Sequence, residues 1–281
     1  MKNDLVAKIK KTTDRNLLKE FPSFTRQELR DIKNGIDAPK ILVFDIETAQ
    51  MVVKVWQLRG NEYIEPKRII RDWFVLCWSA KWLGDKEVLH SRLTSKESLK
   101  ADDKRVVEDI WELFDKADIV IAHNGDRFDV AKLKARFLKH HLGLPSLYRS
   151  VDTLKIARKE FRLSSNKLDY ICGYLGLDVK VDTGGIDLWD RCEAGEEKAL
   201  EKMDLYCQND VIILEELYLA LRPYITNHPN LNVYLEGKVC NNCGSSNLKE
   251  NGYYTTQARK YITYKCNDCG AIIKSKEKYV A

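Results

Sequence analysis

Apolar runs and segments of helical periodicity alternate along residues 39–225. Four runs bounded by turn residues predict strands: "ILVFDIE" (41–47), "WFVLCWSAKWLG" (73–84), "KEVLHSRL" (86–93) and "DIVIAHN" (118–124). Apolar residues at helical spacing predict helices: "DDKRVVEDIWELFDKA" (102–117), "RFDVAKLKARFLKHH" (127–141), "NKLDYICGYLG" (166–176) and "EKALEKMDLYCQNDVIILEELYLALR" (197–222). This alternation predicts one α/β core over residues 39–225.

Different patterns flank this core. Residues 1–38 predict two short helices, the second beginning at a capping box formed by Thr25 and Glu28. This basic segment is either a helical appendage packed on the core, which we favour, or a rudimentary helix-turn-helix. Residues 226–237 predict a linker, and residues 238–281 predict a separate C-terminal domain.

The composition is that of a globular protein without a membrane span. The chain has 281 residues, of which 44% are hydrophobic and 32% are charged. No apolar run approaches the roughly 18–20 residues of a membrane helix. The charged N-terminus lacks the apolar segment of a signal peptide. We therefore expect a cytoplasmic protein.

The net charge of +5 is unevenly distributed. Residues 1–39 carry +3, residues 236–281 carry +4, and the centre between them carries −2. A slightly acidic centre between basic ends fits a metal-binding core whose flanks bind a polyanion. Ordinary solubilising charge is the alternative, and charge alone does not separate the two.

Two acidic side chains close the first predicted strand. Alternation along a strand places Asp45 and Glu47 on one face, where two like charges are costly unless a cation lies between them. Asp129 follows the end of another strand, and Asp210 lies four residues after Tyr206 on one helix face. Four converging carboxylates would hold two divalent cations about 4 Å apart, as in phosphoryl hydrolysis. Oxygen ligands favour Mg²⁺ or Mn²⁺.

Each of these residues also has a structural interpretation. Asp129 could meet the dipole at a helix N-terminus, a role that Asp126 could equally take, although the Phe-Asp pair favours Asp129 as the ligand. Tyr206 alone would be a core tyrosine, and Asp210 alone a solvated helix acid. Three such motifs in order favour the metal site over coincidence.

Other polar residues near these motifs are predicted to be structural. We expect Asp152 to cap the helix that follows it, and His123 to pack or to donate a hydrogen bond to a metal ligand rather than to ligate metal itself. Four scattered cysteines are expected to be core or surface thiols, because none has a neighbouring His that would indicate a nucleophile: Cys77, Cys172, Cys192 and Cys207.

The order "FDIET" (44–48), "HNGDRFD" (123–129) and "YCQND" (206–210) resembles the three motifs of the DEDD exonuclease superfamily. These are ribonuclease H-like 3′→5′ exonucleases, which include the proofreading domains of DNA polymerases. A tyrosine four residues before the last Asp resembles the DEDDy branch. The resemblance covers roughly residues 40–222 and implies a mixed five-stranded sheet flanked by helices. Further segments resemble bacteriophage-encoded proteins that often carry a terminal zinc ribbon: "FVLCWSAKWLG", "TGGIDLW" and "NHPNLN".

The resemblance implies a role for each motif residue. Asp45, Glu47, Asp129 and Asp210 would bind two Mg²⁺ or Mn²⁺ ions, which would activate a water and stabilise the leaving 3′ oxygen. Tyr206 would hydrogen-bond the attacking water and orient it. The product would be a nucleoside 5′-monophosphate, released from DNA and most readily from single-stranded ends.

Three further residues are candidates for binding the substrate. Asn124 and Phe128 match motif positions near the terminal nucleotide, so the resemblance assigns them to substrate positioning. Lys180, in "DVKVDTGG", is a candidate contact for a backbone phosphate, and a solvated loop lysine is the alternative.

The C-terminal region contains two CxxC pairs separated by 22 residues. This spacing predicts a zinc ribbon with one tetrahedral Cys₄ site, and two redox pairs are the disfavoured alternative. Gly244 and Gly270 follow the two pairs, where the turn around a metal requires glycine. The predicted zinc ligands are Cys240, Cys243, Cys266 and Cys269.

Aromatic and basic residues are interleaved around these pairs, and this pattern suits single-stranded nucleic acid. The alternative is that the tyrosines pack a small sheet and the lysines are solvated. The residues concerned are Tyr253, Tyr254, Arg259, Lys260, Tyr261, Tyr264, Lys265, Lys274 and Lys276.

The leading prediction is a bacteriophage-encoded, metal-dependent 3′→5′ exonuclease acting on DNA, with a polymerase or replication protein supplied separately. A 3′→5′ exoribonuclease is the nearest alternative, because the motifs contact metal and phosphate rather than sugar. A non-catalytic nucleic-acid adaptor that uses the zinc ribbon is the alternative from another class. An endonuclease on the same fold is a further possibility.

Overall fold

The computed structural model describes residues 39–57, 63–177, 185–235 and 237–275. The helices predicted within residues 1–38, and Lys180, lie outside this described part. The chain divides into two compact units. One is Lys40–Leu221, and the other comprises Met1–Pro39 and Arg222–Ala281. Among the described residues, no helix is both long enough and apolar enough to cross a membrane.

The first unit is built on a five-stranded sheet of order β5-β4-β1-β6-β7. β1 pairs in parallel with β6 and antiparallel with β4, so the sheet is mixed, as predicted. β6 and β7 continue the parallel part, and β5 pairs antiparallel with β4. The strands are β1 (Ile41–Thr48), β4 (Val75–Trp82), β5 (Leu89–Arg92), β6 (Ile119–Ala122) and β7 (Arg149–Asp152).

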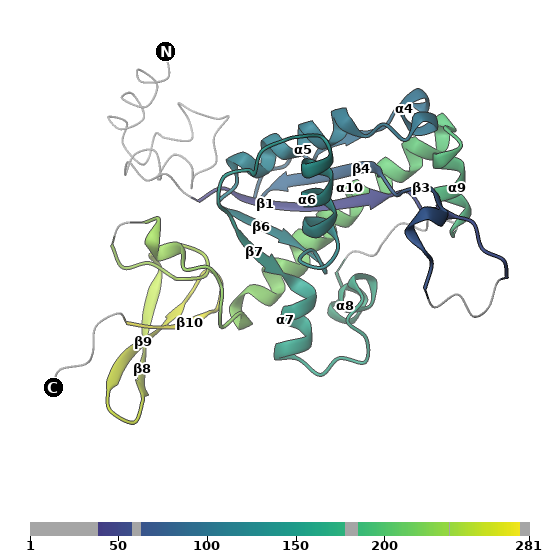
Figure 1. Ribbon diagram of the computed structural model, residues 1–281. Helices are drawn as coiled ribbons and strands as arrows, with labels where there is room; N and C mark the ends of the chain where they lie inside the picture. Colours follow the sequence, from purple (N-terminus) through teal and green to yellow (C-terminus); the bar gives the residue numbers. More distant parts are fainter. Residues whose placement is uncertain (1–38, 58–62, 178–184, 236, 276–281) are drawn as a thin grey trace, which may run out of the picture. The chain divides into compact units, whose positions relative to one another are not determined.

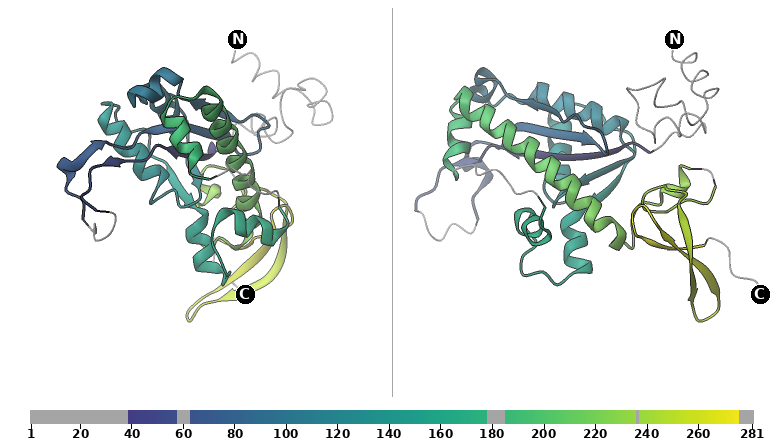
Figure 2. Two further views of the ribbon diagram at one scale, coloured as in Figure 1. Left: turned by 90° about the vertical axis from the view of Figure 1, so that its right-hand side faces the viewer. Right: turned by 180° about the vertical axis from the view of Figure 1, so that it is seen from behind.

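Helices cover both faces of this sheet (Figures 1 and 2). α5 (Lys104–Lys116) and α6 (Asp129–Lys139) lie on one face, and the long α10 (Glu197–Leu221) crosses the other. The apolar stripe of α5 is buried, and the ring of Phe114 meets that of Phe44 edge-on at 4.8 Å. Shorter helices complete the unit: α4 (Ser95–Lys100), α7 (Thr153–Glu160), α8 (Leu168–Leu175) and α9 (Asp187–Glu193).

β1 occupies the centre of the sheet because its apolar residues pack on both sides. Leu42, Val43, Phe44 and Ile46 are buried; burial is continuous from residue 41 to 44 and alternates only toward the carboxyl end of the strand. There the two acidic residues turn to the face that α10 covers. The position of the acids therefore follows from the burial of the apolar residues between and before them.

A second, two-stranded sheet extends from the end of β1 (Figure 1). It pairs β2 (Val52–Val53) antiparallel with β3 (Ile69–Arg71), and the short 3₁₀ helix η1 (Pro66–Arg68) precedes β3. These strands were not predicted, and neither was the position of β7. Each is four residues long or shorter, so none offers enough alternation to identify a strand from sequence.

The second unit contains a three-stranded antiparallel sheet of order β10-β9-β8. Its strands are β8 (Leu248–Thr255), β9 (Lys260–Cys266) and β10 (Ile272–Lys274). Its fully buried cluster contains Cys240, Cys266 and Ala271, which is too little apolar volume to hold a fold together. This unit therefore depends on its cysteines.

The stretch predicted as a linker contributes to the second unit. It follows η2 (Arg222–Tyr224) and includes η3 (Leu231–Val233). His228 and Leu231 are buried, and the Leu231 amide donates to the carbonyl of Asn241 at 2.8 Å. This bond joins the stretch to the first cysteine pair.

Candidate active site and cysteine cluster

Three of the predicted metal ligands converge between β1 and α10. Carboxylate oxygens of Asp45, Glu47 and Asp210 lie within 4.8 Å of one another. Asp45 and Glu47 are half-buried, and Asp210 is only 3% exposed. Three carboxylates at this separation repel one another, so the arrangement favours a bound cation.

α10 positions Asp210 through the packing of its buried face on the sheet. Cys207, three residues earlier, is fully buried on the same helix, and its thiol donates to the Asp45 carboxylate at an Sγ to Oδ2 distance of 3.7 Å. Burial raises the pKa of Cys207 well above its usual value, so the group is a thiol and acts as a donor. The contact ties the helix to the acidic end of β1.

Asp129 lies outside this 4.8 Å group of carboxylates and contacts the backbone of β1 instead. It is the first residue of α6 and is 2% exposed, and its Oδ1 accepts a hydrogen bond from the Ile46 amide at 3.2 Å. Burial raises the pKa of Asp129 to about 7, while hydrogen bonds from backbone amides act in the opposite direction. A neighbouring cation would favour the ionised form.

The loop before α6 is tightly constrained. Asn124 has a φ of 69°, in the left-handed region, and its amide donates to Asp152 Oδ1 at 3.0 Å. A Cβ on Gly125 would lie 2.4 Å from the Ala122 side chain, so only glycine fits there. Asp152 also accepts from the Leu154 amide at the start of α7, which confirms its predicted role as a helix cap.

His123 is held by two hydrogen-bond partners. Its Nδ1 lies 2.9 Å from the Thr153 hydroxyl, and its Nε2 lies 2.9 Å from the Asn166 carbonyl oxygen. The ring therefore links β6 to the segment before α8. In the described part of the chain, His123 belongs to neither cluster of potential metal ligands.

A hollow of about 620 Å³ opens beside the carboxylates, and Tyr206 lines it together with Asp45 and Asp210. The Tyr206 ring meets that of Trp189, on α9, edge-on at 6.4 Å. This contact packs the Tyr206 ring against α9. The phenol therefore stands at the same opening as the carboxylates.

Of the two described residues that were predicted to bind substrate, one lines this hollow and one does not. Asn124 lines the hollow, whereas Phe128 lies outside the lining and packs under the Lys132 ammonium at 4.9 Å. Two exposed cations that sequence reasoning missed, Arg158 and Lys167, do line it. Nothing in their local sequence distinguishes them from solvated surface cations, since their role depends on α7 and α8 meeting at this opening.

The cysteine cluster has the geometry of a tetrahedral site. Four Sγ atoms lie within 4.8 Å of one another. Cys240 and Cys269 are 3.6 Å apart at sulfur, as are Cys243 and Cys266. Zn–S bonds of about 2.3 Å at tetrahedral angles require an S···S separation of about 3.8 Å. The separations are far too long for disulfide bonds.

Backbone turns shape this cluster as predicted. Gly244 and Gly270 have φ values of 75° and 79°, and each amide donates to the carbonyl of the first cysteine of its pair. Hydrogen bonding by the Cys243 thiol lowers the pKa of Cys240 to about 5, so a thiolate forms readily. The donor set fits a structural Zn²⁺, which soft thiolates prefer.

Comparison with known proteins identifies the class of the first unit. Residues 81–222 match the RNase_H superfamily. The match covers half of the chain, and the chain belongs to this superfamily. The matched span contains Asp129, Tyr206 and Asp210, and it begins after Asp45 and Glu47.

One characterised relative is a distant match. The chain is 22% identical over 269 residues to the DNA polymerase III PolC-type of Ureaplasma parvum serovar 3. The match covers 81% of this chain and 18% of that protein, so the chain spans less than a fifth of its relative. The superfamily and this relative together indicate a nuclease.

Proposed function

We propose that the protein is a metal-dependent 3′→5′ exonuclease of the DEDDy branch that hydrolyses DNA, preferentially at single-stranded ends. The observation that carries the proposal is the convergence of Asp45, Glu47 and Asp210 within 4.8 Å, with Tyr206 at the same opening. Asp129 supplies the fourth carboxylate from the start of α6, through its bond to Ile46.

The donor set fits two hard divalent cations. Every candidate ligand is a carboxylate, which favours Mg²⁺ or Mn²⁺ over metals that prefer nitrogen or sulfur. Asp45, Glu47, Asp129 and Asp210 would hold the two ions. When bound, the ions supply Lewis-acid activation of a water and charge stabilisation at the leaving oxygen.

The surrounding residues bind and orient the substrate in this proposal. The Tyr206 hydroxyl orients the water that attacks the terminal phosphodiester, and the ring is held by Trp189. Attack at phosphorus breaks the bond to the 3′ oxygen of the preceding nucleotide and releases a nucleoside 5′-monophosphate. Arg158 and Lys167 provide positive charge for the backbone phosphates at the rim of the hollow.

One assay separates the candidate activities. End-labelled single-stranded DNA and RNA are incubated with Mg²⁺ or Mn²⁺, beside the variant Asp45→Ala. Stepwise shortening of DNA from the 3′ end, lost in the variant, supports the proposal. Preferential shortening of RNA indicates an exoribonuclease, cuts in circular single strands indicate an endonuclease, and binding without cleavage indicates an adaptor.

The cysteine-rich unit carries a second surface that suits a polyanion, and we include it in the proposal. Lys249 lies directly opposite Lys265, and Tyr254 opposite Tyr261, so each pair shares one face of the sheet. Lys274 stands within 5.6 Å of both rings. The lysine–tyrosine face consists of Lys249, Tyr254, Tyr261, Thr263, Lys265, Ile272 and Lys274.

No acidic residue lies on the described part of this face. Two lysines directly opposite each other destabilise a sheet unless an anion screens them. Phosphates beside the lysines and bases stacked on the tyrosines would supply that screening. The face therefore favours single-stranded nucleic acid as its ligand.

Replacing both opposed lysines tests this surface. Lys249→Gln combined with Lys265→Gln should weaken binding of single-stranded DNA and reduce its salt dependence. Lys260→Gln is the matched control, because Lys260 lies on the other face, over Tyr253 at 3.9 Å. Equal affinity of both variants, or no loss of DNA affinity after zinc removal, would refute this role.

Biological setting is also part of the proposal. Because the relative is a DNA polymerase, we propose that this protein works beside a separately supplied polymerase or replication protein. Bacteriophage origin and action in the cytoplasm of a bacterial host remain predictions from sequence.

A further inference from the structure

The two-stranded extension that follows the catalytic strand has no counterpart in the proposed mechanism. We call its described residues, 52–57 and 63–71, the β2–β3 arm. It begins five residues after Glu47, since β1 ends at Thr48 and only residues 49–51 separate it from β2. Figure 1 shows the arm projecting from the end of the sheet to which β1 points.

The arm exposes large aromatic side chains. Trp56 is 88% exposed and Tyr63 is 79% exposed, and Ile70 on β3 is 59% exposed. A tryptophan in this state contributes almost nothing to the core of the fold. Exposed aromatic and apolar groups gathered on one element are typical of binding surfaces.

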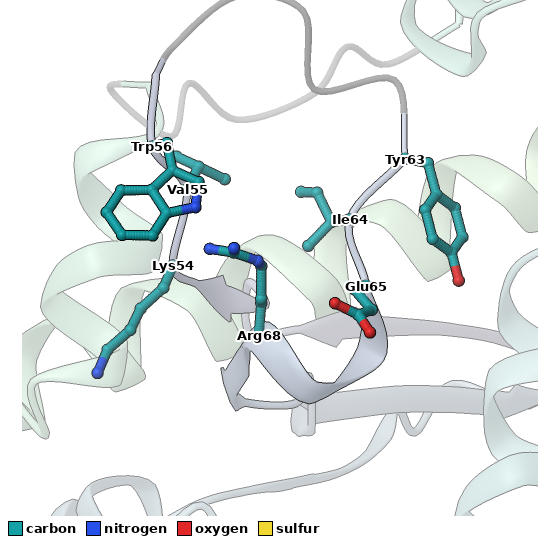
Figure 3. A pocket seen from close by; sticks show the side chains of 7 residues that line it. All are labelled: Lys54, Val55, Trp56, Tyr63, Ile64, Glu65 and Arg68. Atoms are coloured by element: carbon teal, nitrogen blue, oxygen red, sulfur yellow. The ribbon is translucent and has the colours of Figure 1, made fainter.

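Trp56 and Tyr63 border a hollow of about 320 Å³ (Figure 3). The Arg68 guanidinium lies over the Trp56 ring at 5.2 Å, and Figure 3 shows the two side chains facing each other. A cation beside an open indole face is an arrangement in which a base can stack and a phosphate can pair. The lining residues are Lys54, Val55, Trp56, Tyr63, Ile64, Glu65 and Arg68.

Positive charge predominates on the described part of the arm. It has four basic residues, Lys54, Lys67, Arg68 and Arg71, and one acidic residue, Glu65. The Glu65 carboxylate is paired with Lys67 at 2.7 Å. Aromatic rings flanked by cations complement an unpaired nucleic acid strand, in which bases are available for stacking and phosphates repeat along the backbone. A duplex would bury the base faces that the rings require.

The base of the arm is fixed to the catalytic unit. The Gln50 amide donates to Glu193 at 2.6 Å, and its side chain donates to Asp190 at 3.0 Å. Arg71 forms an ion pair with the same Glu193. Both acids belong to α9, the helix whose Trp189 contacts Tyr206. The arm is therefore held in a defined position relative to the carboxylates.

We propose that the β2–β3 arm is a binding site for unpaired nucleotides of the substrate strand, with Trp56 as its stacking platform and Arg68 and Lys54 as phosphate contacts. This inference rests on the proposed function, because it assigns the substrate of the same enzyme. It extends that function by a binding site outside the carboxylate hollow. The arm determines affinity for long single strands and leaves the chemical step unchanged.

The first test measures binding without catalysis. Fluorescence anisotropy of a labelled single-stranded 30-mer, without divalent metal, compares wild type with Trp56→Ala and Trp56→Phe. We expect the Kd to rise about tenfold in Trp56→Ala and to stay near wild type in Trp56→Phe, which retains a ring. Leu147→Ala, at a residue that is fully exposed elsewhere on the unit, is the control and should not change the Kd.

The second test separates the arm from the reaction. The same variants are assayed on the 30-mer and on a mononucleotide p-nitrophenyl ester, which is too short to reach the arm. Trp56→Ala should raise the KM for the 30-mer and leave hydrolysis of the ester unchanged.

The outcomes distinguish this inference from the proposed function. An unchanged Kd in Trp56→Ala overturns the inference, whether or not the wild type cleaves DNA. Equal weakening for a blunt duplex also overturns it, since stacking requires unpaired bases. If Trp56→Ala raises the Kd while the wild type cleaves neither substrate, the arm remains a binding site and the proposed exonuclease activity is refuted.

Discussion

The Asp129 carboxylate accepts a hydrogen bond from the amide of Ile46, at 3.2 Å. That amide lies between the two acidic residues of β1, so one bond joins the start of α6 to the acidic end of β1. The loop before α6 is constrained by Asn124 in the left-handed region and by the close approach of Gly125 to Ala122. The fold thus positions the fourth carboxylate through backbone geometry as well as through side-chain packing.

Asp129→Asn should abolish most of the activity. The amide keeps the shape of the side chain but removes the charge that would hold a cation, so we expect kcat to fall at least about 100-fold. Asp126→Asn is the matched control in the same loop, because the Asp126 carboxylate is bonded to Lys155 and Ser150 at the surface. Initial rates on single-stranded DNA with Mn²⁺ measure both variants.

The comparison also tests which aspartate of the loop acts. Full activity in Asp129→Asn together with loss of activity in Asp126→Asn would contradict the assignment. Thermal unfolding of both variants shows whether a loss of activity is caused by loss of the folded structure.

Tyr206→Phe should reduce kcat about 100-fold and leave KM nearly unchanged. The ring and its edge-on contact with Trp189 remain, and only the hydroxyl that would orient the attacking water is removed. Steady-state kinetics on single-stranded DNA give both constants. A variant with wild-type kcat would show that the hydroxyl has no part in the reaction, and a rise in KM alone would make Tyr206 a binding residue.

Much of the sheet and its long helices could be predicted from sequence. β4, β6, α5 and α10 combine sufficient length with strong periodicity, and all were located correctly. β7 was not located, because its first two residues are exposed and only Val151 and Asp152 are buried. Its pairing with β6 is a tertiary contact that no local pattern encodes.

The site residues could be predicted where the periodicity of a strand or helix determines the direction of their side chains. Strand alternation predicts that Asp45 lies beside Glu47, and helical spacing predicts that Asp210 lies near Tyr206. The structure brings these residues together. Sequence could not foresee Arg158, because an exposed helix cation looks the same whether it faces bulk solvent or a hollow formed by another segment. Tertiary packing alone makes that distinction.

Asp103→Ala should destabilise the first unit strongly. Asp103 is fully buried, accepts from the Val75 amide at 2.9 Å, and is paired with Arg136 and with His140 Nε2. Removing it leaves a buried guanidinium without its counter-ion, which costs about 3–5 kcal/mol. Glu108→Ala removes only an exposed pair with Lys104 and should cost less than about 1 kcal/mol.

Urea unfolding measures this difference cleanly, because all six tryptophans lie between residues 56 and 189. Their fluorescence therefore reports on the first unit alone. Equal free energies of unfolding for the two variants would show that the buried cluster around Asp103 is dispensable.

Zinc removal should unfold the second unit and leave the first one intact. The fully buried cluster of the second unit is Cys240, Cys266 and Ala271, so metal binding supplies most of its folding free energy. We expect one Zn²⁺ per chain, lost in Cys269→Ser and retained in Cys172→Ser, which alters a thiol on α8. A chromophoric chelator measures the stoichiometry, and unchanged tryptophan fluorescence reports the intact first unit. Full zinc content in Cys269→Ser would refute the Cys₄ site.

The second unit should lose stability as pH falls below about 6.5, through His228. Burial lowers the pKa of His228 from 6.5 to about 4, so the folded state holds a neutral imidazole. Between these two values the unfolded chain binds one more proton, and the free energy of unfolding falls by up to about 3 kcal/mol. Zinc release during urea titrations at pH 4–7 measures the free energy of unfolding of the second unit, for wild type and for His228→Gln. Protonation of the cysteines affects both proteins equally, so a smaller pH slope in His228→Gln isolates the histidine, and identical slopes would contradict its buried neutral state.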